Sequence, residues 1–228
     1  MRSSLRRRIL WESLKKTMVK KTLIAHITGL GRSVFSTREL SAVSGKSPST
    51  VSQGLAFLRR QGLVVKVAHG VWAAGGTMPG PYAVIAHILP KQRAYVSFTS
   101  ALHLHGVIEQ IPQVITLASV AHSGEIKTAA GAFTVHHVSP SFFLGFGWRD
   151  GAESFLLAEP EKALVDCLYV SAFRKRQFSH FPELRFPKSF SFKKAYGWVD
   201  AIKNRKAAVH AGRRLEHIKN VGMREGRR

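Results

Sequence analysis

A segment in the first third of the chain has side chains suited to contacts with nucleic acid. Hydroxyl and amide groups, which suit base edges, are carried by Ser49, Thr50, Ser52 and Gln53. Groups suited to phosphates flank them on both sides: Lys46, Arg59, Arg60, Lys66 and His69. Ser47, at the start of the segment, is a further candidate for contact with DNA. Phosphate contacts fix the register of a protein on a duplex more than they read its sequence.

Two short helices joined by a tight turn are predicted to hold these side chains. Ser36, with Glu39 three positions later, forms a capping box for the first helix, which Gly45 ends. Ser47 caps the second helix, and Gly62 supplies its stop. The hydroxyl and cationic residues therefore fall on the second helix of a pair and on the segment that follows it.

An apolar stripe on the second helix predicts which side is buried. Val51, Leu55 and Leu58 recur at helical spacing, so the polar side turns away from them. After Gly62, two apolar runs around Ala68–Gly70 predict a pair of strands. This is the layout of a winged helix-turn-helix, which presents its second helix to a DNA major groove. A capped helix pair that only packs, with no ligand, remains an alternative.

Positive charge is concentrated at the two ends of the chain. The formal net charge is +22. Residues 1–75 hold 14 Lys and Arg against two acidic residues, and residues 171–228 hold 16 against four, whereas residues 76–170 hold five against seven. Such an excess attracts polyanions, and nucleic acid is the first candidate partner.

The basic C-terminal segment is predicted to contact adjacent DNA backbone and to lengthen the footprint. The residues assigned to this role are Arg174, Lys175, Arg176, Arg205, Lys206, Arg213 and Arg214. A solvated cationic surface without a ligand is the alternative.

Cysteine use and hydropathy predict a cytoplasmic protein. Cys167 is the one cysteine, so the chain forms no internal disulfide. Glu12, Lys15 and Lys16 interrupt the apolar run that a signal peptide needs, and no membrane span is expected. Attraction of the basic ends to a membrane surface, and an Arg-rich organelle presequence, are alternatives.

The predicted fold class is α+β, with two domains. Gly75–Pro81 is a breaker cluster, so we expect a winged helix-turn-helix domain over residues 1–76 and a mixed α/β domain over 77–228. The first domain begins with a leading helix over Leu10–Ile27. In the second domain, helices are expected over Tyr82–Leu89, after Ser97, Glu159 and Ser191, and over Arg213–Lys219. Strands are expected over Val114–Ala118, Phe133–Val138 and Phe155–Ala158.

Several residue groups suggest catalysis, but their spacing argues against it. His136 and His137 are neighbours on a predicted strand and point to opposite faces, and His103 and His105 diverge on a helix, with one expected buried and one solvated. We therefore expect no metal site, no cofactor and no enzymatic activity. Glu125-Ile126-Lys127 resembles the end of a nuclease motif but is expected in a turn, and Gly145, Gly147 and Gly151 are also expected to shape turns.

An acidic helix start precedes a charged pair at spacing four. Asp150, Glu153, Glu159 and Glu161 are carboxylates that a Mg²⁺-dependent enzyme uses, and this remains the third alternative. Lys162 and Asp166 are four residues apart and can pair on one helical face. We interpret them as a surface salt bridge, with a partner-binding role as the alternative.

Three segments together resemble the AbiEi family of antitoxins. They are Tyr95–Val107 with Ile111-Pro112, Phe133–Val138 before Phe142–Gly145, and Leu157–Asp166. With the predicted winged helix, the resemblance covers most of Val34–Val170. The basic N-terminal extension and the segment after Ser171 do not align with the family pattern.

The resemblance implies a bacterial antitoxin that represses its own operon. Its N-terminal domain would bind double-stranded DNA at operator repeats, and its C-terminal domain would restrain, directly or indirectly, a nucleotidyltransferase-like toxin. A winged-helix transcriptional regulator whose second domain senses a small molecule or a protein is the alternative. The sequence leaves the oligomeric state and the operator open.

Overall fold

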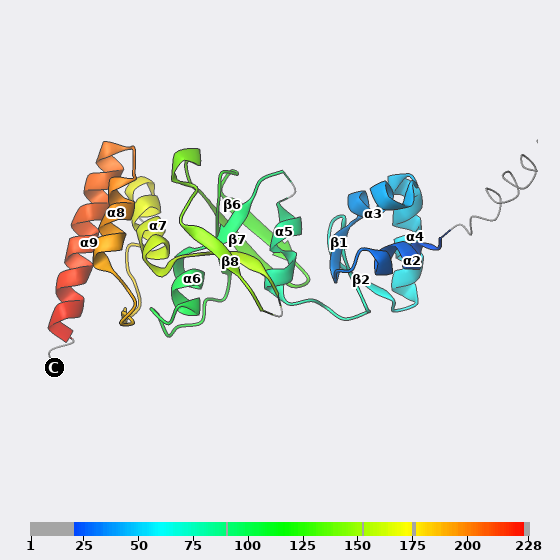
Figure 1. Cartoon of the computed structure of the whole chain (residues 1–228), viewed down its shortest axis with the longest axis horizontal. Coiled ribbons are helices and arrows are strands. Elements are labelled where there is room, and N and C mark those ends of the chain that lie inside the picture. Colours follow the sequence, from blue (N-terminus) through cyan, green and yellow to red (C-terminus); the bar gives the residue numbers. More distant parts are fainter. Residues whose placement is uncertain (1–20, 90, 152, 175–176, 226–228) are drawn as a thin grey trace, which may run out of the picture. The chain divides into compact units, whose positions relative to one another are not determined.

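The computed structural model describes residues 21–89, 91–151, 153–174 and 177–225, which form mixed α and β structure (Figure 1). The predicted α+β class is confirmed at this level. Two compact units divide the chain: the first ends at Thr77 and the second begins at Met78, with Val67–His69 grouped with the second. Within the described ranges, no helix is long and apolar enough to cross a membrane.

Over residues 21–77, three helices and a small sheet make up the first unit. The helices are α2 (Leu23–Gly29), α3 (Thr37–Ser44) and α4 (Pro48–Arg60). The strands are β1 (Val34–Ser36), β2 (Val64–Ala68) and β3 (Val71–Ala74), in the order β1-β3-β2. Strand β1, which was not predicted, runs antiparallel to β3 and pairs Phe35 with Trp72. Of the expected leading helix over Leu10–Ile27, Leu10, Leu14 and Met18 lie outside the described residues. The prediction of one continuous helix is wrong at Thr22, which is extended and caps α2, so α2 begins only at Leu23 and continues to Gly29.

Local capping explains where α3 and α4 begin and end. The Glu39 amide donates to Ser36 Oγ at 3.1 Å, and the Ser36 amide donates to the Glu39 carboxylate at 2.7 Å, which completes the predicted capping box. Gly45 then ends α3 with φ +65°. Ser47 Oγ accepts from the Thr50 amide at 3.2 Å, as predicted for the cap of α4.

The apolar faces of these elements meet in one core. Leu40, Val51 and Leu55 are fully buried there, beside Phe35 and Trp72. Helix α2 approaches α4 closely at a glycine: a Cβ on Gly54 would lie 2.7 Å from Leu23 Cδ2. The orientation of α4 is thus fixed by packing along one side only.

A six-stranded mixed sheet forms the centre of the second unit. Its strands are β4 (Ala94–Val96), β5 (Ile115–Ser119), β6 (Gly124–Thr128), β7 (Gly131–His137), β8 (Phe146–Arg149) and β9 (Phe155–Ala158). The order is β6-β7-β5-β4-β9-β8, with β5–β7 and β4–β9 parallel and the other pairs antiparallel.

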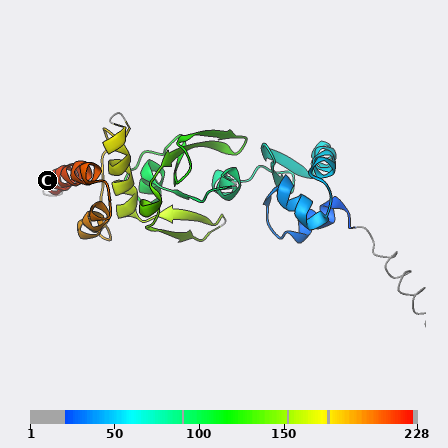
Figure 2. The same cartoon turned by 90° about the horizontal axis from the view of Figure 1, so that it is seen from above.

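The described part of the second unit also contains two 3₁₀ turns and five helices. They are the 3₁₀ turns η1 (Pro81–Val84) and η2 (Pro140–Phe142) and the helices α5 (Ile85–Ile88), α6 (Phe98–Leu104), α7 (Pro160–Phe173), α8 (Phe192–Asp200) and α9 (Arg205–Glu225). Helix α7 packs against α6, α8 and α9, and lies between the sheet and the α8–α9 pair (Figures 1 and 2). Its residues from Glu161 to Ser171 are all buried.

Some predictions for the second unit are confirmed and others are wrong. The three expected strands appear as β5, β7 and β9, within two residues of the predicted ends. Glu125, expected in a turn, lies in β6, and Gly147 lies in β8. The helix expected over Tyr82–Leu89 is split into η1 and α5. Ser97 stands at the cap position of α6, but its hydroxyl makes no capping bond.

Candidate nucleic-acid interface

One face of α4 is polar and has no partner within the described part of the chain. The opposite face buries Val51 and Leu55 completely. Ser49, Ser52 and Gln53 are exposed, and their side chains form no hydrogen bond with described residues. Ser52 and Gln53 lie three and four positions after Ser49, so all three are on the same side of the helix. Their hydrogen-bonding groups are therefore available to a ligand.

The start of α4 is held by its own hydroxyls. Ser47 Oγ lies 2.9 Å from Thr50 Oγ1, in addition to its bond with the Thr50 amide. Ser41 Oγ donates to the Lys46 carbonyl at 2.6 Å and so fixes the turn between α3 and α4. The Ser47 and Thr50 hydroxyls already form hydrogen bonds within the cap, so a ligand would have to use their remaining hydrogen-bonding capacity. The Lys46 ammonium is exposed and can bind a phosphate.

Cations and an aromatic ring mark the other end of α4. Arg59 and Arg60 are exposed in its last turn, where positive charge is favourable. The Phe57 side chain is 52% exposed, and the Arg60 guanidinium carbon lies 6.0 Å from its ring centre. Phe57 falls outside the buried stripe of Val51 and Leu55, so its exposure follows from the same helical spacing.

The hairpin of β2 and β3 carries two more of the predicted contacts. Lys66 is exposed on β2, with its ammonium 6.0 Å from the Trp72 ring centre, and His69 is exposed at the tip. The Thr37 amide donates to the Gly70 carbonyl at 2.9 Å, and Trp72 Nε1 donates to Thr37 Oγ1 at 3.0 Å. These bonds fasten the hairpin to the start of α3.

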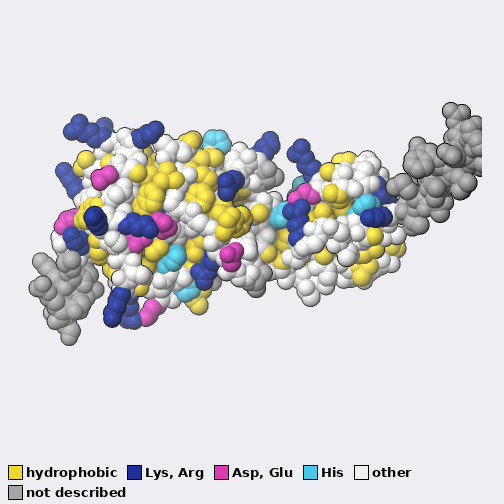
Figure 3. Space-filling model, viewed as in Figure 1, with side chains coloured by type: hydrophobic (Ala, Val, Ile, Leu, Met, Phe, Trp, Pro, Cys, Tyr) yellow, Lys and Arg dark blue, Asp and Glu magenta, His cyan; other side chains and the backbone are white. Residues whose placement is uncertain are grey.

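The predicted C-terminal cations differ in availability. Arg174 and Arg213 are exposed, and Figure 3 shows Lys and Arg side chains on the surface over α8 and α9. Lys175 and Arg176 lie outside the described residues. Arg214 is not available as predicted, because its guanidinium donates to Ser171 Oγ at 3.0 Å and to two backbone carbonyls, of Phe178 at 2.8 Å and Ser179 at 2.9 Å. Burial lowers the pKa of Arg214.

The histidines suggested as metal ligands are separated. His136 is buried and His137 is exposed, so the prediction that they face opposite sides of a strand is confirmed. Burial, with a smaller effect of Arg174, lowers the pKa of His136 to about 4. His103 and His105 are both partly buried, which corrects the expectation of one buried and one solvated ring. Across the described ranges, no three His, Cys, Asp or Glu side chains lie close enough together to hold a metal.

Lys162 and Asp166 form a buried ion pair, and the interpretation as a surface salt bridge is wrong. Both side chains have an exposed fraction of 0%. The Lys162 ammonium donates to Asp166 Oδ1 and, at 3.0 Å, to the Tyr95 hydroxyl. Asp166 Oδ2 accepts from the Tyr95 hydroxyl at 3.0 Å and from Ser97 Oγ at 2.6 Å. This explains why Ser97 does not cap α6.

The surroundings of this pair are aromatic. The Lys162 ammonium lies 3.9 Å from the Phe142 ring centre. Burial lowers the pKa of Lys162, while Asp166 opposes that change, and burial together with Asp166 raises the pKa of Tyr95 well above its usual value. The network joins α7 to β4 with its hydrogen-bonding capacity used internally, so it positions the core of the second unit.

The predicted contacts between Lys46 and His69 are all exposed and lie on α4, the turn before it and the β2–β3 hairpin. They are Lys46, Ser47, Ser49, Thr50, Ser52, Gln53, Arg59, Arg60, Lys66 and His69. No protein-family model and no curated protein matches this chain. The roles of these side chains are therefore inferred from their own chemistry and placement.

Proposed function

We propose that the first unit is a winged helix-turn-helix domain that binds double-stranded DNA. In this proposal α3 and α4 are the helix pair, and β2 with β3 is the wing. One observation carries it: Ser49, Ser52 and Gln53 are exposed on one side of α4 without partners, while the other side is buried. Arg59 and Arg60 lie two helical turns after Ser52 and Gln53, so exposed cations extend the same polar side of α4.

In this mechanism, base contacts and phosphate contacts are made by different side chains of the first unit. Helix α4 enters the major groove, where the Gln53 amide has the donor and acceptor that pair with adenine N7 and N6. Arg59 and Arg60 meet phosphates at one end of α4 and Lys46 meets them at the other, while Lys66 and His69 extend the contacts along the wing. These cations fix the register of α4 on the duplex.

The second unit is proposed to act as the antitoxin part of an autorepressor. The three segments that resemble the AbiEi antitoxins meet in one cluster: β4 pairs with β9, and Tyr95 contacts both Phe143 and Asp166. Their packing together supports a shared role for them. In this role the second unit restrains a nucleotidyltransferase-like toxin, and exposed cations such as Arg174 and Arg213 hold DNA backbone beside the site of the first unit.

A double substitution at the end of α4 tests the DNA-binding proposal. The Arg59→Ala, Arg60→Ala variant lacks two exposed cations. It should bind more weakly both to a duplex from upstream of the protein's own gene and to a duplex of random sequence. If both contact phosphate, the slope of log affinity against log salt should fall by about 1.8 in magnitude, as measured by fluorescence anisotropy. Lys127→Ala with Lys188→Ala is the matched control, since it removes two exposed cations from the second unit. An equal change of slope in the two variants would refute the role of α4.

Co-expression separates the two proposed roles. A toxin-like gene beside this one, expressed with the wild-type chain, should no longer arrest growth. The Arg59→Ala, Arg60→Ala variant should still protect the cells but should lose repression of a reporter placed behind the operon promoter. Failure of the wild-type chain to protect would contradict the antitoxin role and leave the regulator alternative.

A further inference from the structure

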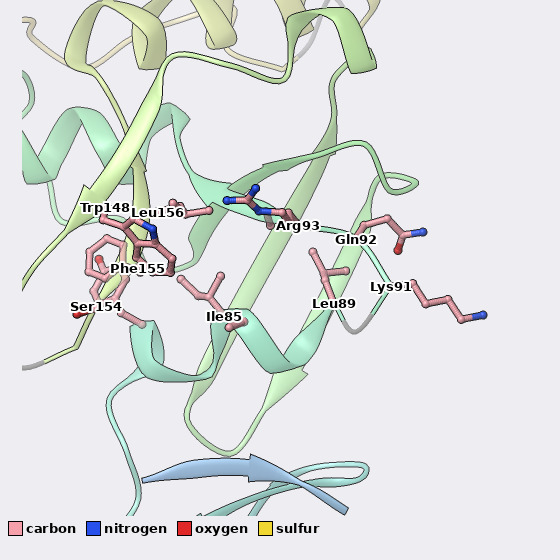
Figure 4. A pocket seen from close by; sticks show the side chains of 12 residues that line it. Ile85, Leu89, Lys91, Gln92, Arg93, Trp148, Ser154, Phe155 and Leu156 are labelled. Carbon is pink, nitrogen blue, oxygen red and sulfur yellow. The ribbon is translucent and has the colours of Figure 1, made fainter. Parts of the chain in front are cut away.

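A cavity of about 300 Å³ lies at one end of the sheet in the second unit, beside α5 (Figure 4). It is bounded by the residues before β4, by the end of β8 and by the start of β9. This volume is at the lower end of the range for small-molecule sites.

Aromatic and aliphatic side chains form the walls of the cavity. The rings of Tyr82 and Phe155 are stacked, with their centres 4.4 Å apart and an angle of 17° between their planes. Trp148 lines the same cavity, although its side chain is 65% exposed, and Ile85 and Leu156 add aliphatic surface. An exposed tryptophan beside a stacked aromatic pair offers a flat apolar surface to a planar molecule.

The described residues that line this cavity include two cations, Lys91 and Arg93, and no carboxylate. Glu153 and Arg149 lie close enough to Tyr82 to act on the pKa of its hydroxyl, but neither lines the cavity. In Figure 4 the Arg93 side chain extends toward Trp148 and Leu156, whereas Lys91 points away. The Arg93 guanidinium makes no hydrogen bond or ion pair with the described residues. The nearby Glu153 carboxylate instead accepts from the Ala83 amide at 3.1 Å.

We propose that this cavity binds a small planar anion of the aromatic carboxylate class. The ring lies against Trp148 and the Tyr82–Phe155 pair, and the carboxylate meets the Arg93 guanidinium, which can bind it with two parallel hydrogen bonds. The proposal is independent of DNA binding by the first unit. It also does not depend on the proposed antitoxin role of the second unit.

Calorimetric titration of the full chain with 1-naphthoate tests this site, with 1-naphthamide as the neutral probe of the same shape. We expect saturable binding of naphthoate at one site per chain and binding of the amide that is at least about tenfold weaker. Arg93→Gln should weaken naphthoate binding by about tenfold or more and leave amide binding unchanged. Arg205→Gln is the matched control, because Arg205 is also exposed in the second unit and lies outside the cavity.

Two further variants locate the ligand. Trp148→Phe should remove the quenching of tryptophan fluorescence by naphthoate while calorimetric binding persists. Ala86→Trp places a large side chain at an exposed position of the lining and should abolish binding without changing the far-ultraviolet circular dichroism spectrum. The proposal is overturned by equal affinity for the two probes, by equal losses in Arg93→Gln and Arg205→Gln, by binding that survives Ala86→Trp, or by the absence of saturable binding.

Discussion

The buried Lys162–Asp166 pair makes a quantitative prediction about the stability of the second unit. Asp166→Leu leaves the Lys162 ammonium without its carboxylate at a position with an exposed fraction of 0%. Loss of one partner of a buried pair costs roughly 3–5 kcal/mol. The Tyr95 and Ser97 hydroxyls also lose their shared acceptor, so the loss should fall toward the upper part of that range. A surface pair would contribute only about 0.2–1 kcal/mol.

The matched variant removes both charges. Lys162→Met with Asp166→Leu replaces the pair by apolar groups of similar volume, and this exchange is commonly neutral or stabilising for buried pairs. The two hydroxyls still lose a partner, so we expect a residual loss of about 2 kcal/mol. The double variant should therefore be more stable than Asp166→Leu alone by about 2 kcal/mol.

Urea denaturation followed by circular dichroism and tryptophan fluorescence measures these differences. The chain has four tryptophans, and Trp11 is replaced by Phe throughout. Trp148 and Trp198 belong to the second unit and Trp72 to the first, so further Trp→Phe backgrounds assign each transition to a unit. The reasoning is refuted if Asp166→Leu costs less than about 1 kcal/mol. It is also refuted if adding Lys162→Met destabilises the Asp166→Leu variant further.

Two other predictions concern the second unit. The pKa of His136 is about 4 in the folded state and about 6.5 in the unfolded state. Below pH 6.5 the unfolded state therefore binds a proton that the folded state does not, and lowering the pH from 7 to 5 should reduce the free energy of unfolding by about 2 kcal/mol. His136→Phe should reduce this pH dependence in urea titrations and His137→Gln should not; equal slopes in all three proteins would argue against the assignment. Arg214→Gln should lower the free energy of unfolding of the unit by about 2–3 kcal/mol and leave DNA affinity unchanged. Arg213→Gln should leave that free energy unchanged and weaken DNA binding, as measured by fluorescence anisotropy. A loss of affinity confined to Arg214→Gln would contradict the internal role of that guanidinium.

Sequence predicts the first unit well because its signals are local. The capping box of Ser36 and Glu39, the left-handed Gly45 and the Ser47 cap each depend on residues at most three positions apart, and all are present in the structure. Strand β1 was missed because it has three residues and forms only by pairing Val34–Ser36 with β3, more than thirty positions later.

The second unit shows what local patterns cannot supply. The spacing of Lys162 and Asp166 fits an exposed helical pair, yet α7 is covered on several sides by α6, α8 and α9. One signal was present: the residues between and after these two are Ala163, Leu164, Val165, Cys167 and Leu168, and a helix that is apolar all round is buried. Arg213 and Arg214 are adjacent in sequence, and only packing decides which one faces solvent.

The measurement that tests the central claim most directly is a base-pair substitution profile for the wild-type chain and for Gln53→Ala. Each position of the bound duplex is changed in turn, and the affinity is measured at fixed salt. If α4 reads the major groove through Gln53, the variant should lose roughly 1–3 kcal/mol of discrimination at one base pair and keep the rest of the profile. A uniform loss at every position, or an unchanged profile, would contradict the placement of α4 in the groove.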